Sequence, residues 1–183
     1  MIYYVGYIPP KEFKNFYADL IRDVSKRFEL NGLAQNNRVP HITLKSPFEI
    51  SSSQSLDEVV SNFCQDQEPS SIEINGVGSF EKEVIFLHSQ PSTQMIDTFR
   101  KLLNSLRGVK GMGWNEYDNP NKKLHITLAK GEELEGKFQG VYNYLKARDI
   151  KFTLPFDNIT IFQKDGGKTS IHRTYNLRKT PGG

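Results

Sequence analysis

The tetrapeptide His41-Ile42-Thr43-Leu44 occurs a second time, unchanged, as His125-Ile126-Thr127-Leu128. Both copies lie in short runs of β-branched and apolar residues, which are typical of strands. Side chains alternate along a strand, so the histidine and threonine of each copy point to one face and the two aliphatic residues to the other. The repeat therefore predicts two equivalent strands, each presenting an imidazole and a hydroxyl on the same side.

The segments around the two copies follow the same order. Strand, helix, loop, strand, helix, strand is predicted from residue 2 to residue 80 and again from 84 to 163. We interpret this order as an internal duplication within a single domain, 1–183, with pseudo-repeat lobes roughly at 1–80 and 84–163. Asp165-Gly166-Gly167 predicts a hairpin before a last strand at 170–177. Between the lobes the sequence shows no linker.

Spacing of apolar residues at i, i+3 and i+4 predicts the helices of both repeats. The clearest examples are residues 13–28 and 96–106. Asn31-Gly32 is a helix-stop signal, and we expect a polar loop over 33–40.

Composition places the chain among ordinary globular proteins. It has 183 residues, of which 37% are hydrophobic and 25% charged, and this balance excludes wholesale disorder. No apolar run reaches the ~20 residues of a membrane span. The first ten residues lack the features of a signal peptide, and the lone cysteine, Cys64, offers no internal disulfide. We therefore expect a cytoplasmic protein with no membrane contact.

Charge is distributed unevenly along the chain. Residues 1–97 carry 8 basic and 13 acidic side chains, whereas residues 98–183 carry 16 basic and 8 acidic ones. A basic half is compatible with a phosphate-bearing partner, although scattered surface lysines give the same count.

Two histidines on a shared face suit in-line displacement at phosphorus. One imidazole removes a proton from the nucleophile, and the other protonates the leaving oxygen. The ordinary imidazole pKa near 6.5 populates both protonation states near neutral pH. Threonine hydroxyls donate to non-bridging phosphate oxygens. We therefore predict that His41, Thr43, His125 and Thr127 are catalytic.

With these motifs the chain resembles the 2H phosphoesterases, which include RNA 2′,3′-cyclic phosphodiesterases, also called 2′-5′ RNA ligases. Two tandem H-x-T/S-x motifs mark that family, matched here at 41–44 and 125–128. The flanks are also similar: Tyr4–Pro10, Pro40–Lys45, and Gly76–Phe80 before the next strand. The resemblance covers nearly the whole chain.

The resemblance implies a bilobal α+β fold, with two pseudo-symmetric antiparallel sheets flanked by helices around a central groove. It implies catalysis without metal or cofactor on an RNA 3′ end or a small nucleotide, by a protein we expect to be a monomer. It assigns leaving-group protonation to His41 and water activation to His125, although pseudo-symmetry allows the reverse. Hydrolysis of a 2′,3′-cyclic phosphate or of a 2′-5′ linkage is the expected reaction. The alternative is a non-catalytic nucleotide- or RNA-binding module that uses the same groove.

Four further residues are candidates for substrate binding. Lys45 shares a strand face with Thr43, although a solvated lysine is the alternative, and Phe48 follows the first motif. Trp114, in the long loop before the second motif, would stack on a base or anchor the loop. A third H-x-T, His172-Arg173-Thr174, lies outside the duplicated frame. Arg173 would contact phosphate if this strand lined the groove, and otherwise the strand is ordinary surface. We predict no metal site, because neither motif has an H-x-x-x-H spacing or a carboxylate cluster beside it.

Overall fold

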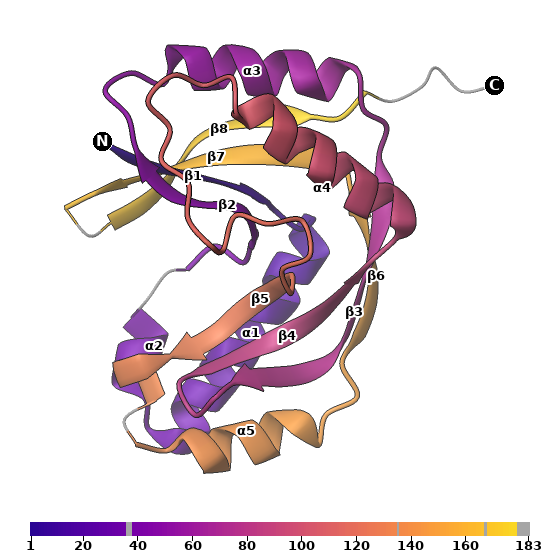
Figure 1. Cartoon of the computed structure of the whole chain (residues 1–183). Helices are drawn as coiled ribbons and strands as arrows, with labels where there is room; N and C mark the ends of the chain where they lie inside the picture. The colour runs from indigo at the N-terminus through magenta and orange to yellow at the C-terminus, as the bar shows by residue number, and fades with distance from the viewer. Residues whose placement is uncertain (36–37, 135, 167, 179–183) are drawn as a thin grey trace.

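The computed structural model describes residues 1–35, 38–134, 136–166 and 168–178. Its eight strands are all antiparallel to their neighbours and form one sheet in the order β6-β3-β4-β5-β2-β1-β7-β8, curled into a half-barrel (Figure 1). The strand bounds are as follows: β1 Ile2–Tyr7, β2 Ile42–Glu49, β3 Ser70–Phe80, β4 Val84–Pro91, β5 His125–Lys130, β6 Lys151–Phe156, β7 Asn158–Asp165 and β8 Lys168–Asn176. The expected α+β class is confirmed.

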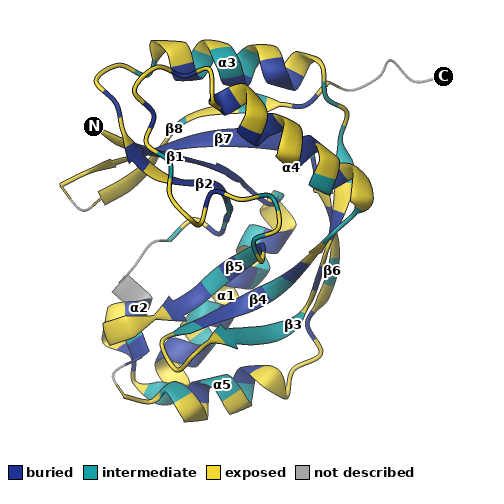
Figure 2. Cartoon of the chain, in the orientation of Figure 1, coloured by how far each residue is buried: buried dark blue, intermediate teal, exposed yellow. Residues whose placement is uncertain are grey.

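The helices pack against the sheet with their apolar sides. Figure 2 shows them buried toward the strands and exposed on the outside. Their bounds are α1 Lys11–Phe28, α2 Asn31–Gln35, α3 Gln54–Gln65, α4 Thr93–Leu106 and α5 Phe138–Lys146, with a 3-10 turn, η1, at Gly131–Leu134. The expected loop at 33–40 is wrong where α2 extends to Gln35, and residues 36–37 lie outside the described residues. None of the described helices combines the length and apolarity of a transmembrane segment.

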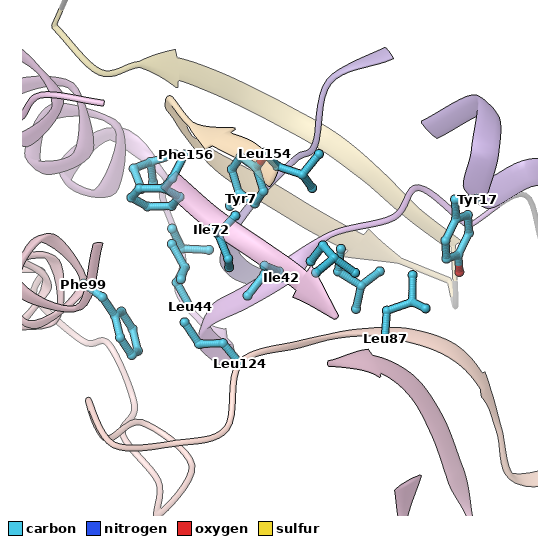
Figure 3. Close-up of a cluster of buried hydrophobic side chains, with 14 of the residues drawn as sticks. Tyr7, Tyr17, Ile42, Leu44, Ile72, Leu87, Phe99, Leu124, Leu154 and Phe156 are labelled. Carbon is cyan, nitrogen blue, oxygen red and sulfur yellow. The ribbon is translucent and has the colours of Figure 1, made fainter. Parts of the chain in front are cut away.

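The helix cap and the buried strand residues expected from the sequence are both present in the structure. Ser92 caps α4 by accepting a hydrogen bond from the Met95 N–H at 3.2 Å. One large cluster of buried side chains joins the helices to the sheet, and Ile42 and Leu44 of the first motif lie within it (Figure 3). These two residues and Ile126 have no exposed surface, whereas Leu128 is 1% exposed. The aliphatic half of each motif is therefore core.

The sheet consists of two four-stranded halves, and each half takes strands from both sequence repeats. One half has the order β2-β1-β7-β8 and the other β5-β4-β3-β6. β3 comes from the first repeat but pairs with β4 and β6, while β7 comes from the second repeat and pairs with β1. The halves of the sheet therefore do not coincide with the sequence segments 1–80 and 84–163. Strand periodicity does not show this exchange, because it carries no information on pairing partners.

β7 and β8 form the hairpin expected at the C-terminal end, with eight residue pairs from Asn158↔Asn176 to Asp165↔Lys168. Gly166 in its turn has a φ of 52°, which favours glycine. Gly167 lies outside the described residues.

Candidate active site

The two motif strands lie side by side at the centre of the sheet. β2 and β5 are antiparallel, with Ile42 opposite Ile126. This register places His41 next to Thr127 and Thr43 next to His125, on the face opposite the buried isoleucines. All four of these side chains are partly exposed. We call this side of the sheet, which carries His41, Thr43, His125 and Thr127, the histidine face.

Both imidazoles are held by the same hydrogen bond. His41 Nδ1 lies 2.8 Å from the carbonyl oxygen of Val39, and His125 Nδ1 lies 2.9 Å from that of Lys123. A carbonyl oxygen only accepts, so each Nδ1 carries the proton and donates. In the neutral ring Nε2 is then an unprotonated base, and in the charged ring it is an acid. Either histidine can therefore serve in either role.

Each imidazole also packs on a pair of aromatic rings. His41 lies 5.3 Å from Tyr4 and 5.0 Å from Phe162, centroid to centroid, and those two rings stack at 4.5 Å. These contacts fix the ring plane of His41 from β1 and β7.

The second histidine repeats this packing from β3 and β4. His125 lies 4.9 Å from Phe80 and 5.0 Å from Phe86, and those two rings are 4.5 Å apart. Gly78 permits the arrangement, because a Cβ there would lie 2.6 Å from the Phe86 ring. No sequence pattern marks these four aromatic residues as part of the site, although Tyr4 and Phe80 lie in the flanks that carry the family resemblance. Pairing of distant strands, which sequence does not reveal, brings them to the histidines.

Burial and neighbouring cations lower the pKa of both histidines. For His41, burial is the main cause, and Arg38, His125 and Lys130 lower the pKa further. The hydrogen bond to Val39 acts in the opposite direction. His125 is among these causes, in agreement with the register that places the two motif strands side by side.

His125 has the same pattern of causes. Burial lowers its pKa, Lys122 and Lys123 lower it further, and the Lys123 carbonyl opposes them. The main causes of both shifts are burial, a backbone hydrogen bond and neighbouring basic side chains, and no carboxylate is among them. This face of the sheet is therefore electropositive and suited to an anion such as phosphate.

The Thr43 and Thr127 hydroxyls make no side-chain hydrogen bond within the described ranges of the chain. Both donors are thus available next to the two imidazoles. His88 lies opposite His125 in the β4–β5 register, and burial and Lys123 lower its pKa.

Lys45 and Phe48 lie in different surroundings from those expected. Lys45 has no exposed surface, and its ammonium bonds Asp118 Oδ2 at 2.9 Å and the Gly113 carbonyl at 2.8 Å. Phe48 is 5% exposed and lies beneath the Lys45 ammonium. The expectation that Lys45 and Phe48 contact substrate is corrected, because the Lys45 side chain has no accessible surface and Phe48 is almost fully buried. The sequence does not reveal that Asp118, 73 residues away, is the partner of Lys45.

Trp114 packs partly buried against the core, with the Lys45 ammonium 4.9 Å and the Arg107 guanidinium 4.5 Å from its ring. These contacts anchor the loop between α4 and β5. Stacking of Trp114 on a base stays a prediction.

His172 and Arg173 of the third H-x-T lie on the face opposite the two motifs. His172 Nε2 lies 2.9 Å from Asp57 Oδ2 on α3, on the helix-covered side of the sheet. Arg173 pairs with Ile161, whose side chain is buried in the core, and it interacts with Tyr175 and Asp57. Arg173 thus lies on the opposite face from His41, which corrects the expectation that it contacts substrate phosphate.

Among the described residues, no group of three or more His, Cys, Asp or Glu side chains is arranged to hold a metal ion. The chemistry available at the histidine face is therefore that of two imidazoles, two hydroxyls and the surrounding cations.

Known proteins share this architecture. The chain is 25% identical over 181 residues, 96% of its length and 95% of the other, to the "Putative phosphoesterase GK0864" of Geobacillus kaustophilus. The solved structure of TT0787 from Thermus thermophilus superposes with a TM-score of 0.60 at 17% identity, covering 97% of this chain and 98% of that one. E. coli LigT complexed with 3′-AMP superposes with a TM-score of 0.59 at 15% identity and the same coverage. These structures share the fold. The model of the 2′-5′ RNA ligase superfamily matches residues 9–168, which include both motif strands, and the chain belongs to that superfamily.

Proposed function

We propose that the protein is a metal-independent phosphodiesterase that opens 2′,3′-cyclic phosphates, or cleaves 2′-5′ linkages, at RNA ends or in small nucleotides. One observation carries this function: the matched hydrogen bonds of His41 and His125, which hold Nδ1 of each imidazole and leave proton transfer to Nε2. A structural histidine needs no such duplicate. In-line displacement at phosphorus needs two imidazoles, one as the base and one as the acid.

Hydrolysis of a cyclic phosphate then proceeds in one displacement. Nε2 of His125 removes a proton from water as its oxygen bonds to phosphorus. The opposite P–O bond of the ring breaks, and the departing ribose oxygen takes a proton from Nε2 of His41. The products are an open phosphomonoester, a neutral His41 and a charged His125, and proton exchange with solvent restores both rings. This assignment of roles follows the family resemblance.

The surrounding residues stabilise the negative charge that builds up on the phosphate. Thr43 and Thr127 donate hydrogen bonds to its non-bridging oxygens. Arg38, Lys122, Lys123 and Lys130 act electrostatically on the histidines and supply positive charge around the same position. Metal polarisation is not required for this step.

A nucleotide substrate is supported by membership of the superfamily. Structures of the fold-related LigT contain 3′-AMP, ATP or NADP+. On the present protein, exposed aromatic surface lies beside the histidines, since Phe80 is 37% exposed. An aromatic ring at this position suits a base attached to the phosphate.

The test is turnover of a panel of the four 2′,3′-cyclic mononucleotides and a 2′-5′-linked dinucleotide, followed by chromatography of the products. We expect an open nucleoside monophosphate from at least one substrate. Isothermal titration with 3′-AMP, run in parallel, measures binding without turnover. Binding with no hydrolysis across the panel would instead favour a nucleotide-binding module, and neither binding nor hydrolysis would overturn both functions.

A further inference from the structure

The two motif strands are joined by very little of the sheet. β2 and β5 share one paired position, Ile42↔Ile126, whereas β7 and β8 share eight. His41 and His125 directly precede these two isoleucines. Ladder hydrogen bonds therefore do little to fix the separation of the two imidazoles, and other contacts must do so.

One such contact lies beyond the C-terminal end of the first motif. The Lys45 ammonium and the Asp118 carboxylate, both without exposed surface, pair at 2.9 Å. Asp118 also accepts the backbone N–H groups of Ser46 and Asn115, each at 2.9 Å. These bonds, together with Lys45, lower its pKa, so it is a carboxylate at neutral pH. They tie the loop that leads into β5 directly to β2.

Lys122 adds a second bond at the same end. Its Nζ donates to the carbonyl oxygen of Leu44 at 2.7 Å. Lys122 lies three residues before His125, and Leu44 lies three residues after His41. This contact therefore also runs from one motif to the other.

A second ion pair lies at the other end of the contact between β2 and β5. Arg38, three residues before His41, pairs through Nη2 with Oε1 of Glu133 in η1, just after β5. Both side chains are mostly buried, at 20% and 13% exposure. The second carboxylate oxygen of Glu133 accepts the Lys130 N–H at 2.9 Å, which fixes it to the end of β5. One ion pair therefore links the two motif strands on each side of their single paired position, Ile42↔Ile126.

We propose that Lys45–Asp118 and Arg38–Glu133 are positioning pairs that set the distance and alignment of His41 and His125 for the displacement, an inference that rests on the proposed function. Buried ion pairs add little net stability, because desolvation offsets their attraction, and their value lies in defining one geometry. In-line displacement needs such definition, since a misplacement of ~1 Å costs on the order of 10²-fold in rate.

The decisive variant is Glu133→Gln. The amide keeps an acceptor for Lys130 N and nearly the same volume, but it no longer forms an ion pair with Arg38. We expect kcat to fall at least ~10-fold with KM changed less than ~3-fold, because alignment matters most in the transition state. Inhibition constants show separately how the variant binds the ground state and the transition state. Orthovanadate, which takes the five-coordinate shape of the transition state, should bind at least ~10-fold more weakly, while inorganic phosphate binds as well as to the wild type.

Charge alone predicts a different result for this variant. Removing the Glu133 carboxylate leaves Arg38 in place and makes the site more positive, which strengthens binding of both anions. Asp118→Asn tests the other end with the same four measurements, and Glu133→Gln still decides the question if Asp118→Asn fails to fold. Arg38→Lys, which retains the ion pair, should keep most of the kcat that Arg38→Met loses.

Asp23→Asn is the matched control. The Asp23 carboxylate pairs with Arg148 at 2.6 Å and accepts from Tyr144 at 2.8 Å, which joins α1 to α5 away from the histidines. The Asp23→Asn substitution should lower the melting temperature without changing kcat or vanadate inhibition. If Glu133→Gln and Asp118→Asn behave like this control, the pairs are merely structural and the inference is wrong, while the proposed function stands. A wild type that neither hydrolyses the panel nor binds phosphate overturns the proposed function, and the positioning role with it.

Discussion

At the scale of single residues, the site consists of two copies of one arrangement. In each copy a carbonyl two residues earlier holds Nδ1, two aromatic rings fix the imidazole plane, and nearby cations lower the pKa of the ring. Nothing in either copy marks it as permanently acid or base. In the proposed reaction, the side of the phosphate that the leaving oxygen occupies decides which histidine is the acid and which is the base.

Removing either imidazole should therefore disable the enzyme. We expect His41→Ala and His125→Ala each to lower kcat/KM by at least ~10²-fold, because each removes one proton-transfer step. The double variant should lose less than the product of the two losses, since the pair acts as a unit. Steady-state kinetics on a cyclic mononucleotide measures all three, and full activity in either single variant contradicts the mechanism.

Activity should depend on pH with an optimum set by the two lowered pKa values. The base must be neutral, so activity rises as pH passes its pKa, and the acid must be charged, so activity falls above its pKa. Both histidines titrate below 6.5 in the free enzyme, which places the optimum of kcat/KM on the acidic side of that value. A bound phosphate anion raises both pKa values, so the kcat profile should lie at higher pH. Coincident profiles, or a kcat/KM optimum well above pH 6.5, would count against this assignment.

At the scale of elements, the third H-x-T motif connects β8 to α3. Asp57 accepts hydrogen bonds from His172 at 2.9 Å and from Tyr175 at 2.7 Å, and the Tyr3 ring packs edge-on against His172. These bonds lower the pKa of Asp57 despite its partial burial. The cluster holds an edge strand of the sheet onto the helix layer.

His172→Ala should thus affect stability more than catalysis. We expect kcat/KM within ~3-fold of the wild type and a loss of about 1 kcal/mol in the free energy of unfolding, the typical net value of one hydrogen bond. Since the folded-state pKa of Asp57 is depressed, its contribution is present above the unfolded pKa near 3.8 and disappears as pH falls through the folded pKa. Urea unfolding at pH 7 and at successively lower pH measures this, and the two proteins should converge in acid. A loss of activity as large as that of His41→Ala would place His172 in the catalytic site instead.

At the scale of the whole molecule, each half of the sheet requires strands from both sequence repeats. β3 has its partners in β4 and β6, and β1 pairs with β7 (Figure 1). A fragment that ends at residue 80 lacks the partners of its last strand and one partner of its first. We expect residues 1–80 and 84–183 to be unfolded when expressed separately, as measured by circular dichroism and amide chemical-shift dispersion. A cooperative thermal transition in either fragment would show that the repeats fold independently.

Chelation should leave the enzyme active. The described residues offer imidazoles and hydroxyls at the histidine face but no carboxylate or thiol cluster around them. We expect the same kcat before and after dialysis against EDTA, measured on one cyclic substrate with the protein concentration matched. Complete loss on chelation, restored by a divalent cation, would contradict the two-histidine mechanism.

The sequence by itself determined the order of the strands and longer helices and the composition of the two motifs. Alternation along a strand and i, i+3, i+4 spacing are local properties, so His41, Thr43, His125 and Thr127 could be assigned to one side of their strands without a structure. Exact repetition of the tetrapeptide further indicated that both copies serve one site.

Only the tertiary structure decided which distant residues meet. It placed Lys45 in a buried ion pair with Asp118, brought Tyr4 and Phe162 onto His41, and exchanged β3 and β7 between the halves of the sheet. None of these contacts has a local pattern, because strand pairing and ion pairing join residues by complementarity in space rather than by spacing along the chain. A lysine on the same strand face as the motif threonine looks available for substrate until its partner carboxylate, 73 residues away, has folded against it.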